Sequence, residues 1–158
     1  MKTKIILFAI LSLGYISCKQ AIKEDATSKE TYTTNEGTEK VPHLNNDWVA
    51  EMVLNNGRKW EANLETIYGV AAMSNLIKET KTSSIEEYRN LGNTLNEVKN
   101  NIVKECTMTG ASHDNLHVFL HPLIQKIELL QKTDNTDAAA KIKESIQGHL
   151  KSYYTYFD

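Results

Sequence analysis

The sequence predicts an all-α protein, an up-down-up-down antiparallel four-helix bundle preceded by a disordered tether and a short N-terminal helix. From residue 46 onward, apolar residues recur at three- and four-residue steps, the period of a helix face. Alternating β-branched runs are missing and glycine-based hairpin signals are almost absent. Short connections at 81–83, 109–112 and 132–136 favour antiparallel neighbours.

The chain begins with the pattern of a secretory signal peptide. Lys2 and Lys4 precede the apolar run 5–13, which is too short to span a bilayer. Small residues follow that run, as they do before a cleavage site. We therefore predict that residues 1–17 are a lipoprotein signal peptide, removed on export.

The end of this segment resembles a bacterial lipobox. Cys18 follows Ser17, although Tyr15 stands where an aliphatic residue is usual. Lipidation of Cys18 would hold the protein on the bacterial cell envelope, in the outer membrane, without a transmembrane helix. The alternative is an ordinary signal peptide cleaved nearby, with Cys18 left as a thiol or removed.

Two further domains follow from composition. Residues 18–45 are polar and rich in Thr, Glu and Lys, which predicts a flexible linker. Residues 46–158 form the helical bundle domain, long enough for one core. Residues 1–17 hold two of the 18 basic residues and no acid, so the remainder carries 16 bases against 20 acids. This acidic balance argues against nucleic acid as a partner.

Each helix of the bundle has its own signal. Asn46 or Asp47 is expected to cap a short helix, and the first long helix is expected over 58–80, with Trp60 and Leu64 on its buried face. Ser84 and Glu87 form a capping box for the second. The buried stripe of the second helix is expected to contain Tyr88, Leu91, Leu95, Val98, Ile102 and Cys106. That of the third is expected to contain Leu116, Phe119, Leu120, Leu123, Ile127 and Leu130. That of the fourth is expected to contain Ile142, Ile146, His149 and Tyr153. Pro122 is expected to kink the third helix.

The candidate site is the corner between the second and third helices. Antiparallel register places Cys106, His113, His117 and His149 in one layer of the bundle, with Met108 at its lip. Asp114 is expected to orient His113 or His117 through a carboxylate hydrogen bond. Thiolate, thioether and imidazole together suit copper or zinc rather than magnesium or calcium. The sequence thus predicts a Cu or Zn site with Cys106, Met108, His113, His117 and His149 as candidate ligands.

Other interpretations of the same residues stay open. Cys106 and Met108 are also ordinary core residues, and His149 on an apolar face is also typical of a hydrogen-bonded core histidine. His121 lies on the solvent side, with His117 further out than His113. The bundle would then be a structural or interaction module for an envelope protein partner. A b-type haem held by His113 or His149 with Met108 or Met73 is a third alternative.

Two motifs carry a resemblance. The two motifs are W-E-A-N-L-E-T-I-Y-G-V-A-A-M at Trp60–Met73 and C-T-M-T-G-A-S-H-D-N-L-H at Cys106–His117. They resemble small exported helical lipoproteins of Bacteroidota-type bacteria, a group without an established activity. The resemblance implies a helical lipoprotein and carries no residue role.

No phosphate-binding loop or nucleophile elbow is present, and a Cys106–His113 thiol enzyme would lack an oxyanion arrangement. We therefore predict that the protein is not an enzyme.

Overall fold

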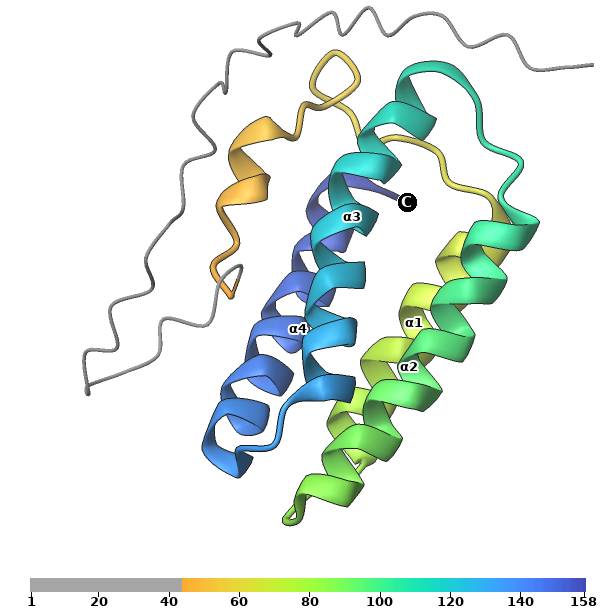
Figure 1. The fold of residues 1–158 in the computed structure, drawn as a ribbon. Helices are drawn as coiled ribbons and strands as arrows, with labels where there is room; N and C mark the ends of the chain where they lie inside the picture. The colour runs from red at the N-terminus through yellow and green to blue at the C-terminus, as the bar shows by residue number, and fades with distance from the viewer. Residues whose placement is uncertain (1–43) are drawn as a thin grey trace, which may run out of the picture. The chain divides into compact units, whose positions relative to one another are not determined.

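Four α-helices follow one another in the computed structural model, which describes residues 44–158. They are α1 (Leu64–Glu79), α2 (Ile85–Glu105), α3 (Gly110–Lys132) and α4 (Thr136–Tyr156), preceded by the short 3₁₀-helix η1 (Asp47–Glu51) (Figure 1). Consecutive helices pack together, and α1 also packs against α4, which closes the bundle. The predicted all-α four-helix bundle is confirmed. The predicted signal peptide, with Cys18 and nearly all of the predicted linker, lies outside the described residues.

One core runs through the middle of the four helices. Its fully buried side chains come from every helix and include Val70, Met73, Leu95, Ile102, Leu123, Ile127, Ile142 and Ile146. All six predicted apolar positions of α3 are buried, and α3 adds the polar residues Asn115 and Lys126 to its inner face. Within residues 44–158 no helix has both the length and the apolarity to cross a bilayer.

The predicted capping box of α2 is present, whereas Asn46, at the N-cap of η1, makes no side-chain capping hydrogen bond. The Ser84 hydroxyl accepts from the Glu87 backbone N–H at 3.3 Å, and the Glu87 carboxylate accepts from the Ser84 N–H at 2.9 Å. Hydrogen bonds from the backbone N–H groups of Ser83 and Ser84 lower the pKa of Glu87 to about 2. At α4, the Asn135 side chain accepts from the Ala138 N–H at 2.9 Å. These caps fix where α2 and α4 begin.

The predicted start of the first long helix at residue 58 is wrong. The chain is extended there, and the Trp60 N–H donates to the Tyr156 carbonyl at 2.8 Å while the Asp158 N–H donates to the Trp60 carbonyl at 3.1 Å. Because these backbone groups pair with the end of the chain, α1 begins only at Leu64. Its buried face is Thr66, Val70, Met73 and Ile77, whereas Leu64 is 60% exposed.

The predicted turn at 109–112 also differs. α2 ends at Glu105, residues 106–109 form the connection, and α3 begins at Gly110 with a positive φ of 62°. Glycine tolerates this left-handed conformation without steric cost, so the chain can enter α3 directly after the connection. α3 then continues through Pro122 to Lys132 without an interruption of the helix.

α1 and α2 approach closely at Gly69. A Cβ atom added to Gly69 would lie 2.3 Å from Cγ1 of Ile102, a side chain that is only 1% exposed. Because Ile102 is enclosed by the core, it has little room to yield. The two helices can therefore keep this separation only with glycine at position 69.

Gly69→Ala should lower the free energy of unfolding by about 1–3 kcal/mol, because the new methyl group overpacks the α1–α2 interface. Gly148→Ala is the matched control: it too replaces a helical glycine, but the added Cβ would meet only ordinary contact at 3.4 Å. The control should gain up to about 1 kcal/mol from helix propensity. Chemical denaturation measures both. Equal effects of the two substitutions would contradict the close approach.

Candidate functional site

The two sulfur side chains of the predicted metal site lie in the connection between α2 and α3. Cys106 is a free cysteine at the C-cap of α2, half-buried, and Met108 follows in the connection, also half-buried. Both pack against the hydrophobic core. The inward orientation expected for Cys106 is thus consistent with its core contacts, and these contacts are those of an apolar filler.

The three histidines of α3 form a row along its outer side. His113 is half-buried, whereas His117 and His121 are exposed, and the sequence likewise predicts that His113 lies nearest to the core. The ring centroids of His113 and His117 are 4.5 Å apart, and those of His117 and His121 are 5.2 Å apart. We call these three residues the imidazole row. Asp114, the predicted carboxylate partner, is exposed, and His113 and His117 contact each other instead.

Ring nitrogens face one another along the imidazole row. Nε2 of His113 lies 3.1 Å from Nε2 of His117, and Nδ1 of His117 lies 3.3 Å from Nε2 of His121. Two imidazole nitrogens bound to one zinc ion at about 2.0–2.1 Å each are roughly 3.3 Å apart in tetrahedral geometry. They are about 2.9 Å apart as neighbours in a square plane, the geometry of Cu(II). The His113–His117 separation lies between these two values, and it is also the length of an ordinary hydrogen bond from the N–H of one ring to the other ring.

His149 does not join the row. Its predicted height is nearly right, because Nε2 lies 2.8 Å from the Phe119 carbonyl on α3, but its side chain is completely buried on the core side. Its other ring nitrogen, Nδ1, lies 3.2 Å from Nζ of Lys126. Both nitrogens therefore have partners, and neither is free for a metal ion or a haem iron. The predicted layer of Cys106, His113, His117 and His149 is not formed, because His149 faces the core while His117 faces solvent.

Sequence reasoning missed the residue that His149 contacts, Lys126. Its side chain is fully buried on α3 and donates from Nζ to Asn46 Oδ1 at 2.6 Å and to His149 Nδ1. The ion pairs found in residues 44–158 are Lys104–Glu105 and Lys132–Glu128, so Lys126 has an amide and an imidazole as partners and no carboxylate. A signal was present, since Lys126 follows Phe119 by seven residues and Leu123 by three, in phase with the buried stripe.

Burial determines the protonation of this pair. It lowers the pKa of Lys126 from 10.5 to about 8. Burial, together with the positive charge of Lys126, lowers the pKa of His149 to about 3, against the opposing effect of its hydrogen bond to the Phe119 carbonyl. His149 is therefore neutral at physiological pH, with the proton on Nε2 donated to Phe119 and the lone pair of Nδ1 accepting from Lys126.

The residues before α1 cover this pair. Trp48 stacks on His149 with ring centroids 4.2 Å apart, and its Nε1–H donates to Asn46 Oδ1 at 3.1 Å. On its outer side, the same segment borders a groove of about 340 Å³ against α3. Trp48 and Glu51 form one wall, and residues of α3 including His117 and His121 form the other. The groove thus runs beside the imidazole row.

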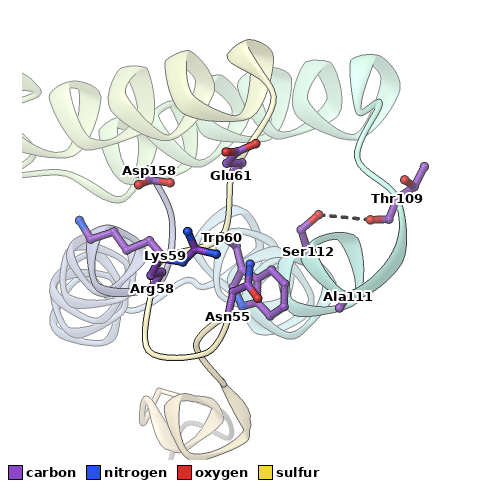
Figure 2. A pocket seen from close by; sticks show the side chains of 9 residues that line it. All are labelled: Asn55, Arg58, Lys59, Trp60, Glu61, Thr109, Ala111, Ser112 and Asp158. Carbon is purple, nitrogen blue, oxygen red and sulfur yellow. Dashed lines mark hydrogen bonds between the residues drawn. The ribbon is translucent and has the colours of Figure 1, made fainter.

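A larger pocket of about 470 Å³ lies where the segment before α1, the start of α3 and Asp158 come together (Figure 2). Arg58 and Lys59 line it together with Glu61 and Asp158. Two bases and two acids leave no preference for an anion or a cation. The Ser112 hydroxyl at its edge donates to the Thr109 carbonyl at 3.2 Å and is therefore engaged within the connection.

Comparisons with known protein families, with curated proteins and with solved structures find no match to this chain. The site must therefore be argued from its own geometry. Within residues 44–158, no group of three or more His, Cys, Asp or Glu side chains is placed to hold a metal ion. Among the ring nitrogens of the row, those of His113 and His117 lie nearest to each other, at 3.1 Å.

The pKa of His149 predicts loss of stability in acid. Unfolded His149 takes up a proton near its usual pKa of 6.5, whereas in the folded protein it does so only near 3. Its stabilising contribution is therefore complete above pH 6.5 and is lost as the pH falls toward 3, at about 1.4 kcal/mol per pH unit well below 6.5. Denaturation curves recorded between pH 7 and 4.5 measure the free energy of unfolding at each pH. In His149→Gln this free energy should depend less on pH. If the free energy of unfolding fell with pH equally in the variant and in the unaltered protein, His149 would not be a buried neutral imidazole.

Proposed function

We propose that the chain is an exported, lipid-anchored helical protein that binds copper or zinc through the paired imidazoles of His113 and His117. The observation that supports the proposal is the 3.1 Å separation of their Nε2 atoms: the two rings hydrogen-bond at a distance that two ligands of one ion would also have. The proposal assigns no reaction to the site. Of the five candidate ligands predicted from sequence, His113 and His117 remain in the proposed site. Cys106, Met108 and His149 contact the core and are not part of that site.

The helix supplies the preorganisation for this pair. Residues four apart lie on the same side of an α-helix, so His113 and His117 need no loop or partner chain to bring them together. α3 is fixed by its buried stripe, with Leu116 only 1% exposed between the two histidines. The remaining coordination positions are open to water or to a ligand from solution. Such an open site suits capture and transfer of an ion better than permanent storage.

His117 is the member of the row shared by both close contacts, so it should matter most. His117→Ala leaves His113 and His121 eight residues apart, roughly 12 Å along the helix, too far to share an ion. Affinity for Cu(II) and Zn(II) should fall at least about tenfold, to the level of a single surface histidine. His113→Ala should weaken binding less, since His117 and His121 remain, and exposed Gln125→Ala on α3 is the control.

Competition titration of the purified full chain against chromophoric chelators measures these affinities. One ion per chain is expected for the unaltered protein. Cys106→Ser should leave the affinity unchanged. Loss of binding in Cys106→Ser with normal binding in His117→Ala would contradict the imidazole pair and return the site to the α2–α3 connection.

The membrane anchor is proposed from the sequence, on the basis of Lys2, Lys4, the apolar run 5–13 and the Ser17-Cys18 pair. Its acyl chains would place the bundle at the envelope surface, in the outer membrane, on a polar linker. Cys18 is the attachment point in this proposal.

Cys18→Ser should abolish incorporation of an alkyne-labelled fatty acid in bacteria that express the chain, because no thiol remains at the lipidation position. Cys106→Ser is the matched control, since it removes the other cysteine and should keep the label. In-gel fluorescence after attachment of a dye measures both. Labelling that survives in Cys18→Ser would rule out the anchor.

A second candidate function is binding to another envelope protein. Leu64 and Tyr68 lie one turn apart on the outer side of α1 and are 60% and 68% exposed. Large apolar side chains adjacent to one another on a surface favour contact with a protein partner. This function requires no metal ion, so it would become the leading proposal if the row bound metal no more tightly than a single histidine.

A further inference from the structure

The segment of residues 44–53, which we call the strap, leads from the linker to the bundle and includes η1. It lies beside α3 and is held by side chains of α3 and α4 (Figure 1). Ser145 donates its hydroxyl to the Leu44 carbonyl, and Lys126 donates to the Asn46 side chain at 2.6 Å. Nearer its end, the Val53 N–H donates to the Asn115 side chain at 3.2 Å.

The strap adds few side chains to the hydrophobic core of the four helices. Among the buried apolar residues of the described part of the chain, the strap contributes Trp48 and Met52, while the others come from α1 to α4 and from Phe157. Trp48 covers His149 and the edge of Phe119, with centroid distances of 4.2 and 5.6 Å. The strap thus packs on the bundle mainly through Trp48 and Met52 and covers His149 from one side.

Asn46 is the central contact of the strap. Its Oδ1 accepts from both Lys126 Nζ, at 2.6 Å, and Trp48 Nε1, at 3.1 Å, so one amide oxygen orients the tryptophan and satisfies the buried amine. A neutral amide is a weaker partner for an ammonium group than a carboxylate. Lys126 is therefore buried without a counter-charge, and water would solvate it better if the strap moved away.

We propose that the strap is a releasable latch over Lys126 and His149. When it is docked, Trp48 and Asn46 seal the amine and the imidazole from water. When it is released, both groups face solvent while the four helices stay folded. Release would also open the wall of the groove beside His117 and His121 that Trp48 and Glu51 provide. The latch itself does not depend on metal binding.

Hydrogen-deuterium exchange of the full chain tests the latch, with the Val49 and Met52 amides as reporters, because both donate to carbonyls within the strap. Asn46→Ala removes the acceptor of both Lys126 and Trp48. It should therefore speed exchange of these amides at least about tenfold, because two hydrogen bonds are lost and the effect of one is already about that size. Asn46→Asp supplies a carboxylate and should slow it by a similar factor. Amides in the cores of α1 to α4 should be unaffected.

The neighbouring asparagine gives a matched control. Asn45 is exposed, and within residues 44–158 its side chain hydrogen-bonds to Asp47 and to no residue of α3 or α4, so Asn45→Ala should leave the docking of the strap unchanged. Acetylation of Lys126, followed by mass spectrometry, should be faster in Asn46→Ala than in Asn45→Ala. Equal exchange and acetylation in these two variants would overturn the latch. The latch would also be overturned if Asn46→Ala accelerated amide exchange in the helix cores as much as in the strap, because the strap and the bundle would then open together.

Discussion

The rotation of α3 about its axis decides what this bundle buries and what it presents to solvent. Its apolar stripe, which includes Phe119, Leu123 and Leu130, packs against the other helices and fixes that rotation. The same constraint places Lys126 inside the protein and directs His117 outward. One helix therefore carries both chemically notable features of the protein, an external row of imidazoles and an internal amine.

The internal amine has a consequence for the rest of the structure. Because Lys126 has no carboxylate partner, it needs acceptors from two other parts of the chain, Asn46 before the bundle and His149 on α4. His149 can serve as an acceptor only while neutral, and its depressed pKa keeps it so. Three separate segments are thus joined by one polar contact inside an apolar core. Removing one partner of such a buried group generally costs more than the bond itself contributes, because the remaining groups lose their solvation.

Local signals predict most of the fold. The Ser84–Glu87 capping box and the apolar stripe of α3 depend only on neighbouring residues, and both are as expected. The start of α1 could not be predicted, because it depends on backbone pairing between Trp60 and residues at the far end of the chain. Lys126 lies in phase with the buried stripe, but a lysine on an apolar face is normally at its exposed edge. Only the positions of Asn46 and His149 explain its burial.

In the candidate site, too, some features follow from neighbouring residues and others depend on packing between helices. That His113 is half-buried while His117 and His121 are exposed follows from helical rotation and agrees with the prediction that His113 lies nearest to the core. The height of His149 also follows from antiparallel register. Its direction does not, since His149 faces Phe119 and Lys126 across the core rather than the solvent side of α3. Register gives the level of a side chain in a bundle, and only the packing of both helices gives the side to which it points.

Metal binding by the imidazole row can be tested by anomalous diffraction from crystals of the protein grown with Cu(II) or Zn(II), with data collected on both sides of the metal absorption edge. One anomalous peak is expected between Nε2 of His113 and Nε2 of His117, about 2.0–2.1 Å from each. A peak beside Cys106 and Met108, or no peak near the imidazole row at saturating metal, would contradict it.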